Sequence, residues 1–365
     1  MQVDKRNIGL DVARAAAILG VFVCHGLNLE VAGKNLLAAL GSGVELFFVL
    51  SGFLIGRIYF RSSKSSSFSF WSFWRSRWWR TLPPYFAAIL VYVGVHLAFP
   101  AEGLHWYYGL FLQNYLGVTG LGPSWSLCVE EHFYLFLPVL ALLADQLTGR
   151  KSLRYLLPVA FFVPMVLRFV TLTIYKPLPA QWFWFTHLHC DGLIAGVWLA
   201  YLFVEDHAAF ERLKKPAKWL LPISPLMVII LPIWDPRPPA MDMLVNTIYA
   251  VGYAAWVRYL YDLRWNPTTV LETRLRSATV GVALCSYSVY LTHATFDPVI
   301  RHNILGAWHR GIGKSLVVLF LTFLLGVIFY ILIERPTIIS RDRYLNGRSR
   351  AKLDMRQPVG VSEQA

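Results

Sequence analysis

The chain has 365 residues, of which 56% are hydrophobic and 15% are charged, and its mean hydropathy is +0.49. A soluble domain carries about 25% charged residues, so this composition excludes an ordinary soluble fold. The net charge of +13 would suit a nucleic-acid-binding protein, but the basic residues gather between apolar runs instead of along one helix face. We therefore expect a membrane-embedded protein with no nucleic-acid partner.

Ten apolar runs predict an all-α bundle of membrane-spanning helices, because each approaches the about 20 residues that a helix needs to cross a bilayer. The expected spans are residues 8–28, 43–60, 82–99, 123–144, 155–174, 187–204, 219–234, 241–260, 278–298 and 315–334. Prolines interrupt the seventh of them, so we expect it to be irregular. The four cysteines fall inside apolar runs without a zinc-type spacing, and no metal site is expected.

The placement of Lys and Arg predicts the orientation of the bundle. With a cytoplasmic N-terminus, 26 of the 34 Lys and Arg side chains fall in inside segments and 6 in outside segments. Cytoplasmic loops carry such an excess, so both termini are expected in the cytoplasm, which requires an even number of spans. Residues 1–340 are expected to form one transmembrane domain, and residues 341–365 a basic, disordered cytoplasmic tail.

The first span contains ionisable residues, each costing on the order of 2.5–3.5 kcal/mol at a helix centre, which marks them as candidate functional residues. Arg14 and His25 are eleven residues apart. This spacing is close to three helical turns, so the two side chains share one helix face about 16 Å apart along the axis. The alternative is that each of them extends to its nearer membrane interface.

The second and fourth spans carry acidic residues at their outer ends. Glu45 begins the second span, which also holds Ser51, and Glu130 begins a run of three ionisable residues in the fourth. The predicted topology places His25, Glu45 and Glu130 at similar depth, and a carboxylate beside an imidazole is suited to general base catalysis. If the fourth span starts later, Glu130 lies at the interface instead.

The segment FWSFWRSRWWRTLPPYF (70–86) interleaves Arg75, Arg77 and Arg80 with tryptophans on the predicted inner side. Arginine forks bind phosphates and aromatic rings stack on adenine, so the segment is a candidate nucleotide-phosphate site. An interfacial helix that holds anionic membrane lipid would have the same composition. The sequence leaves both readings open.

Taken together, these motifs resemble the bacterial acyltransferase-3 family of integral membrane acyltransferases, and the resemblance spans nearly the whole chain. The matching segments are the Arg-x10-His pair of the first span, GVELFFVLSGFLI (43–55), Arg77–Tyr85, PSWSLCVEEHFY (123–134), SYSVYLTHA (286–294) and ERP (334–336). The resemblance implies ten helices in the bacterial inner membrane and cytoplasmic acyl-CoA, such as acetyl-CoA, as donor. It also implies a hydroxyl of an exported or cell-surface glycan or glycolipid, such as lipopolysaccharide, as acceptor.

The resemblance also implies roles for particular residues, with His25 as general base or transient acyl carrier. The expected catalytic residues are His25, Arg14, Glu130 and Glu45; the expected donor-binding residues are Arg75, Arg77, Arg80 and Ser51; and the expected acceptor-binding residues are Trp125, Tyr134 and His293. The family often has Arg where His189 stands, which leaves the role of His189 and Asp191 open. The hydrolase-like C-terminal domain of some members is absent, so a stand-alone form is expected.

The competing class is a transporter or flippase, in which the intramembrane Arg, His and Glu would line a substrate or proton path. The sequence shows no internal repeat of the kind common in transporters, and the Arg and Trp segment suits an acyl donor. A polytopic sugar transferase fits poorly, because Glu30 is the one acidic residue in the first outer loop. The identity of the acceptor and of the acyl group stays open.

Overall fold

The computed structural model describes residues 6–27, 40–65, 68–99, 102–174, 182–230, 239–308 and 311–354, whose regular secondary structure is helical, with no strand among them. The helices are α1 (Ile8–Gly26), α4 (Gly43–Ser62), α5 (Phe70–Ala98), α6 (Gln113–Leu116), α7 (Ser124–Thr148), α8 (Leu153–Ile174), α9 (Asp191–Glu205), α10 (His207–Arg212), α11 (Lys214–Leu220), α12 (Ile223–Ile230), α13 (Pro239–Tyr261), α14 (Val270–Pro298), α15 (Ile312–Phe329) and α16 (Arg335–Asp354). Short 3-10 turns cover Trp106–Leu110, Arg150–Ser152, Trp182–Trp184 and Thr186–Leu188, and π-helical turns cover Val299–Ile304 and Tyr330–Glu334.

Six helical stretches in the described part of the chain are long and apolar enough to cross a membrane, namely Ile8–Gly26, Gly43–Ser62, Phe70–Ala98, Ser124–Thr148, Arg150–Ile174 and Ile312–Tyr344. The all-helical, multi-pass architecture is therefore confirmed. Of the other expected spans, α9 has 15 residues and α12 has 8, whereas α13 and α14 are long but less apolar. The number of ten spans stays a prediction.

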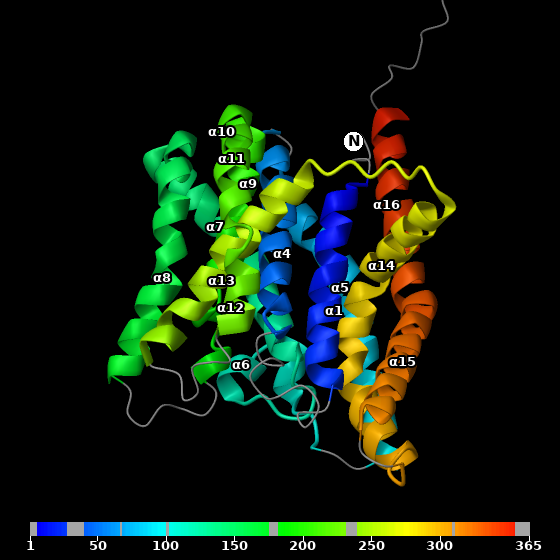
Figure 1. Cartoon of the computed structure of the whole chain (residues 1–365). Helices are drawn as coiled ribbons and strands as arrows, with labels where there is room; N and C mark the ends of the chain where they lie inside the picture. The colour runs from blue at the N-terminus through cyan, green and yellow to red at the C-terminus, as the bar shows by residue number, and fades with distance from the viewer. Residues whose placement is uncertain are drawn as a thin grey trace, which may run out of the picture.

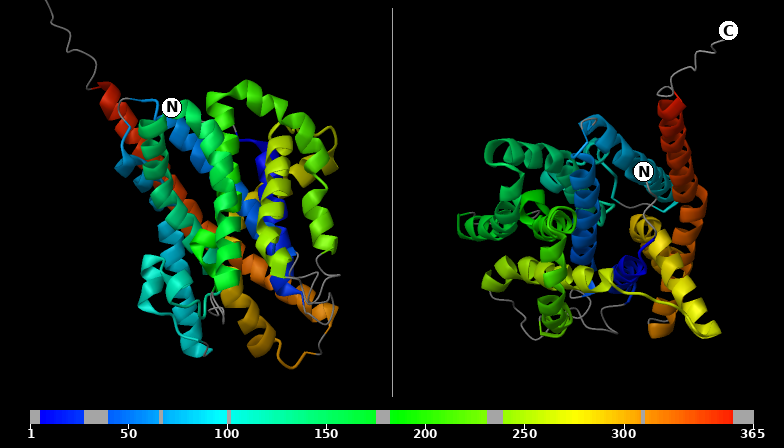
Figure 2. Two further views of the ribbon diagram at one scale, coloured as in Figure 1. Left: turned by 90° about the vertical axis from the view of Figure 1, so that its left-hand side faces the viewer. Right: turned by 90° about the horizontal axis from the view of Figure 1, so that it is seen from above.

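The long helices lie side by side, and the start of α1 and the end of α16 lie at the same end of the bundle (Figure 1). We call this the terminal end and the other the distal end. This arrangement agrees with an even number of crossings, and the cytoplasmic placement of the terminal end stays a prediction. Seen along the bundle (Figure 2, right), α1 and α4 lie between the α8–α9 side and the α14–α15 side.

Several expected boundaries differ from the structure. The sixth span starts at Asp191 and not at residue 187, because a 3-10 turn precedes α9. The seventh is divided into α11 and α12 around Pro222, which has no backbone N–H to continue a helix, and residues 231–234 lie outside the described part. Helix α16 continues the last span to Asp354, so the first part of the expected disordered tail is helical.

The segment 70–86 forms the first part of α5, a continuous helix of 29 residues that also contains the third span. Its arginines therefore stand on the same helix as the residues that cross the membrane. Pro83 and Pro84 lie inside this helix, where each removes one backbone hydrogen bond. Ser69 begins it, accepting a hydrogen bond from the backbone N–H of Ser72.

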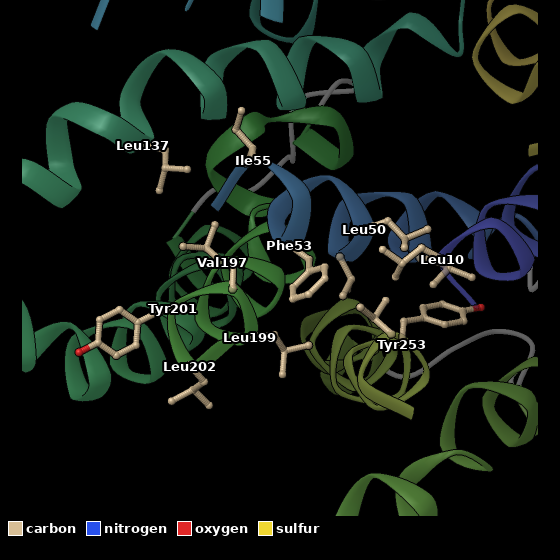
Figure 3. Packing of buried hydrophobic residues seen from close by; sticks show 14 of the residues in the cluster. Leu10, Leu50, Phe53, Ile55, Leu137, Val197, Leu199, Tyr201, Leu202 and Tyr253 are labelled. Carbon is tan, nitrogen blue, oxygen red and sulfur yellow. The ribbon is translucent and has the colours of Figure 1, made fainter. Parts of the chain in front are cut away.

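The larger hydrophobic core forms where α4 crosses α9 and α13 (Figure 3). Phe53, Leu50 and Val197 are each at most 1% exposed. Glycines let α4 and α9 approach this closely: a Cβ on Gly52 would lie 2.0 Å from the Leu193 carbonyl oxygen, and one on Gly196 would lie 2.2 Å from that of Val49. Small residues at such crossings are the usual way in which membrane helices pack. This crossing fixes α4 beside the site described next.

Candidate active site

A polar cavity of about 100 Å³ lies inside the bundle between α1, α4, α5, α7 and α14. The lining residues are Arg14, Val44, Phe47, Phe48, Leu50, Ser51, Leu54, Arg77, Arg80, Thr81, Ser126, Leu127, Glu130, Ser286, Tyr287 and Tyr290. Five of the side chains predicted from the sequence therefore meet here, namely Arg14, Ser51, Arg77, Arg80 and Glu130. Three guanidinium groups and one carboxylate among the lining residues give the cavity an excess of positive charge, which favours an anionic ligand.

Glu130 is held by hydroxyl groups on both of its carboxylate oxygens. Ser51 Oγ donates to Oε1 over 2.7 Å, and the Tyr134 hydroxyl donates to Oε2 over 2.8 Å. Arg77 Nη2 donates to the same tyrosine hydroxyl over 3.0 Å, and its guanidinium lies 4.6 Å from the ring centroid. Because Tyr134 is fully buried, this network fixes both the carboxylate and the arginine at the cavity wall.

Arg14 reaches the cavity from α1 and has a partner on its own helix. Its Nη1 lies 3.5 Å from Oδ1 of Asp11, a carboxylate that is 1% exposed. Arg6 Nε lies 2.5 Å from the other oxygen of Asp11, so this carboxylate is shared between two arginines. The charge of Arg14 is thus only partly compensated, and its guanidinium keeps donors for a ligand.

His25 stands at the distal end of α1, where its side chain is exposed, and it contacts a second imidazole. Its ring centroid lies 4.9 Å from that of His293 on α14, which is 2% exposed. His25 Nδ1 lies 2.9 Å from the Val21 carbonyl oxygen, and His293 Nδ1 lies 2.7 Å from that of Tyr290. A neutral imidazole donates from one nitrogen, so these contacts assign the proton to Nδ1 and leave Nε2 of His25 as a base.

Tyr290 connects the cavity with the two imidazoles. Its ring lines the cavity and lies 5.6 Å from the ring of His293, centroid to centroid. The Tyr290 hydroxyl lies 2.5 Å from Ser126 Oγ and donates to the Pro123 carbonyl oxygen over 2.9 Å. The sequence analysis did not single out Tyr290 or Ser126. The spacing of Ser286, Tyr290 and His293 at i, i+4 and i+7 was the signal that one face of α14 is polar.

Neither acidic residue that was expected to orient His25 contacts it among the described residues. Glu45 lies on the other side of α4, with Oε1 3.7 Å from His189 Nδ1, and Glu130 faces the cavity. The expectation rested on depth alone. Depth does not fix the direction in which a side chain leaves its helix, and Glu45 points toward His189. Glu130 also lies deeper than expected, beside Ser51, which is six residues further along α4 than Glu45. His25 instead has His293 as its neighbour.

The expected donor-binding arginines divide between two faces of α5. Arg77 and Arg80 are three apart and share the face toward the cavity, whereas Arg75, two residues before Arg77, points away. Arg75 Nη1 donates to the hydroxyl of Tyr344 on α16 over 3.3 Å, and Tyr344 also stacks on Trp79. The cavity arginines are therefore Arg14, Arg77 and Arg80.

The three residues expected to bind the acceptor do not share one surface. Trp125 packs edge-on against Phe48 and His189, Tyr134 holds Glu130, and His293 lies behind His25. Of the three, His293 is the one that contacts the expected catalytic imidazole.

A buried ion pair that the sequence analysis left open joins α8, α9 and α13. Arg168 makes two hydrogen bonds of 2.8 Å to the carboxylate of Asp191, and both side chains are at most 1% exposed. Thr247 Oγ1 donates to Asp191 over 2.6 Å and accepts from Arg168 over 2.7 Å. The intramembrane Arg168 is thus explained by a structural partner, and Asp191 does not face the cavity.

Replacing Arg168 with methionine is expected to destabilise the protein by about 3–5 kcal/mol, because it leaves the Asp191 carboxylate buried without its partner. The measurement is the free energy of unfolding in detergent with increasing denaturant. The matched control is Arg154→Met, whose ion pair with Asp206 is partly exposed at 2.8 Å and should contribute about 1 kcal/mol or less. Equal effects of the two substitutions would contradict the prediction.

The apolar helices and the charged cavity among them define a multi-pass membrane protein with a polar site inside its bundle. Residues 7–334 match the family described as "Acyltransferase domain", and the chain belongs to this acyltransferase-3 family. The resemblance read from the sequence motifs is confirmed. Membership also favours an enzyme over the transporter or flippase alternative.

Several relatives have names that state an activity. The chain is 27% identical to the putative peptidoglycan O-acetyltransferase YrhL of Bacillus subtilis, over 90% of the chain and 54% of the relative. It is 29% identical to the peptidoglycan O-acetyltransferase OatA of Listeria monocytogenes, over 53% of the chain and 33% of the relative. It is also 29% identical to the O-acetyltransferase OatA of Staphylococcus aureus, over 45% of the chain and 30% of the relative. The chain thus spans about a third to a half of the length of these relatives. No solved structure matches it.

Proposed function

We propose that this protein is an integral membrane O-acyltransferase that moves an acyl group from acyl-CoA to a hydroxyl group of a cell-envelope glycan. The observation that carries this proposal is the arrangement along α1, with Arg14 in a positively charged cavity and His25 as a free base toward the distal end. Tyr290 and His293 lie between them. The family and the names of its relatives support an O-acetyltransferase, so acetyl is the first acyl group to test.

The donor enters from the terminal end, which in this proposal faces the cytoplasm. Its phosphates bind Arg77 and Arg80 of α5, and Arg14 lies next along the path toward His25. Arginine is suited to this role because its planar fork donates two parallel hydrogen bonds to a phosphate. The cavity of about 100 Å³ is much smaller than the whole coenzyme, so only a part of the donor lies inside it.

The chemistry is a proton transfer coupled to acyl transfer. His25 Nε2 accepts the proton of the acceptor hydroxyl, and the hydroxyl oxygen attacks the thioester carbonyl carbon. The carbon–sulfur bond breaks, and the thiolate of CoA leaves and receives the proton. The products are an ester and CoA. In the two-step form of this route, Nε2 first takes the acyl group from CoA and then passes it to the hydroxyl.

The acceptor in this proposal is a glycan hydroxyl on the distal side of the membrane. Both OatA of Listeria monocytogenes and YrhL of Bacillus subtilis carry peptidoglycan O-acetyltransferase in their names, the latter as a putative one. Peptidoglycan fragments are therefore the first acceptors to test, ahead of lipopolysaccharide.

The test is to incubate purified protein in liposomes with labelled acetyl-CoA and soluble peptidoglycan fragments. Release of CoA thiol together with alkali-labile label on the glycan supports the proposal. Movement of label across the membrane with no release of thiol would overturn it in favour of transport. The same assay with lipopolysaccharide as acceptor compares the two glycan classes.

Replacing Arg80 with glutamine is expected to raise the KM for acetyl-CoA by about tenfold to a hundredfold, since hydrogen bonds to charged groups contribute roughly 1.5–3 kcal/mol each. The KM is measured from the initial rate of CoA release. Arg75→Gln removes the same charge from the opposite face of α5, and its effect should be several-fold smaller. A KM that is raised equally by both substitutions would point to general surface charge instead of the cavity.

A further inference from the structure

The proposed base stands on a part of α1 that a helix by itself does not hold firmly. His25 and Gly26 are the last two residues of this helix. Helix ends fray, because the last four backbone carbonyl groups have no partner inside the helix. A base contributes to catalysis only when its nitrogen is held within reach of the proton that it takes. For His25 to act as proposed, the last turn of α1 needs a support from outside the helix.

Arg301 provides such a support. It lies on the π-helical turn that follows α14, and its Nη2 donates to the Gly26 carbonyl oxygen over 2.7 Å. This carbonyl belongs to the residue directly after His25. The contact satisfies one of the carbonyl groups at the helix end and brings a positive charge to the C-terminal end of α1, where the helix dipole favours it. Arg301 thereby joins the turn that carries His25 to a segment 275 residues away in the sequence.

Asp297 holds Arg301 in the orientation that this contact requires. Nε of Arg301 donates to one carboxylate oxygen of Asp297 and Nη2 donates to the other, each over 3.0 Å. The two side chains are only 16% and 14% exposed, so the ion pair is largely shielded from water. A bidentate pair of this kind fixes the plane of the guanidinium. The direction in which Nη2 meets the Gly26 carbonyl is therefore set by Asp297.

The same part of the chain also supports the imidazole of His25. His293, Asp297 and Arg301 follow one another at intervals of four residues, a spacing that places side chains along one face of a helix. The ring of His293 lies 4.9 Å from that of His25, centroid to centroid. This face of α14 thus contacts the last turn of α1 at two points, at the imidazole through His293 and at the backbone through Arg301.

We propose that Arg301 is a positioning residue for His25. It fixes the last turn of α1 and so keeps Nε2 of His25 directed at the acceptor hydroxyl. This inference rests on the proposed function, because it needs His25 as the base or acyl carrier. Arg301 itself touches neither the donor nor the reacting hydroxyl. Its loss should therefore slow acyl transfer and leave the binding of acetyl-CoA at the cavity arginines unchanged.

The first test measures the reaction. Arg301→Met should lower kcat for ester formation by about tenfold to a hundredfold, because a displacement of about 1 Å at a reacting group can cost about a hundredfold. The KM for acetyl-CoA should stay unchanged. Asp297→Asn keeps Arg301 and an acceptor oxygen for it, so its loss of kcat should be several-fold smaller. Unchanged kcat in Arg301→Met, or equal losses in the two variants, would overturn the proposal.

Arg150 provides a matched control at the terminal end of the bundle. Its Nη2 donates to the Phe60 carbonyl oxygen, in the last turn of α4, over 2.9 Å and to Glu205 Oε1 over 2.8 Å. Arg150→Met removes the same kinds of contact from a helix end that carries no proposed catalytic group. It should lower the thermal unfolding midpoint about as much as Arg301→Met does, yet keep the kcat of the folded protein. An equal fall of kcat in both variants would show a general structural loss and contradict the assignment.

The second test does not depend on activity. Hydrogen exchange, followed by mass spectrometry, reports the opening of the last turn of α1, where the Leu27 N–H donates to the Val23 carbonyl oxygen over 3.0 Å. In Arg301→Met these amides should exchange several-fold faster, whereas those in the first half of α1 keep their rates. Unchanged exchange would overturn the proposal. If the unmodified protein transfers no acyl group, the proposed function fails, and the exchange rates still decide whether Arg301 holds this turn.

Discussion

Replacing His25 with alanine is expected to lower acyl transfer by about 10²–10⁴-fold, the range that a positioned general base contributes. The physical reason is that its Nδ1 is held by the Val21 carbonyl oxygen, which leaves Nε2 as the base at the distal end of α1. The side chain is exposed and makes no ion pair with a described residue, so its loss should not disturb the fold. The measurement is the rate of ester formation on the glycan at saturating acetyl-CoA.

Two further histidine variants test whether the loss of activity is specific to His25. His187, also exposed and outside the proposed site, is the control, and His187→Ala should keep nearly full activity. His293→Phe retains a ring beside His25 but removes the second imidazole, so we expect a smaller loss that appears in kcat and not in the KM for acetyl-CoA. Full activity of His25→Ala with unchanged expression would end the assignment of His25 as the base or acyl carrier.

Replacing Gly196 with leucine is expected to prevent folding. Even a Cβ at this position would lie 2.2 Å from the Val49 carbonyl oxygen and 2.6 Å from the Phe53 backbone nitrogen. Backbone atoms cannot move aside as a flexible side chain can, so α4 and α9 would have to separate and open the largest core cluster. The expected cost exceeds the about 1–3 kcal/mol of ordinary overpacking.

The readout is the yield of monodisperse protein in detergent together with its thermal unfolding midpoint. Gly94→Leu provides a matched control, because Gly94 also lies inside a long helix but nothing stands within 4 Å of its added Cβ. It should fold with nearly normal yield. If Gly196→Leu were recovered at the yield of Gly94→Leu, the close crossing of α4 and α9 would be refuted.

Hydropathy predicted the helical membrane architecture, and intramembrane charge singled out Arg14 and Glu130 of the cavity. Arg77 and Arg80 were singled out by the composition of segment 70–86, and Ser51 by the family resemblance. Placing Arg14 or Glu130 in hydrocarbon costs free energy, so such groups are expected to face one another or a shared cavity inside the bundle. Both line the same cavity in the structure. The basic segment FWSFWRSRWWR was predicted as a part of the chain separate from the third span, whereas the structure joins the two in one helix. Continuity was hidden by Pro83 and Pro84, which usually mark the end of a helix and here lie inside one.

The sequence did not predict which polar residues pair with which. Arg168 falls within the expected fifth span, but its partner Asp191 lies on the next long helix, and their contact depends on how α8 and α9 are rotated. The same uncertainty placed Glu45 beside His25, although it faces His189. Rotation about a helix axis is set by packing, above all by the glycines of α4 and α9, and one sequence without its packing partners contains little of that information.

The prolines of α5 have a mechanical consequence. They stand between Arg80 and Tyr85. After them, the Tyr85 hydroxyl donates to the Tyr108 carbonyl oxygen over 3.0 Å, and the Tyr92 hydroxyl donates to the Glu102 carbonyl oxygen over 2.7 Å. Bending is cheapest where backbone hydrogen bonds are missing. Any bending of α5 is therefore expected at these prolines, between the arginine-bearing half, which Arg77 ties to Tyr134, and the half that Tyr85 and Tyr92 anchor near the distal end.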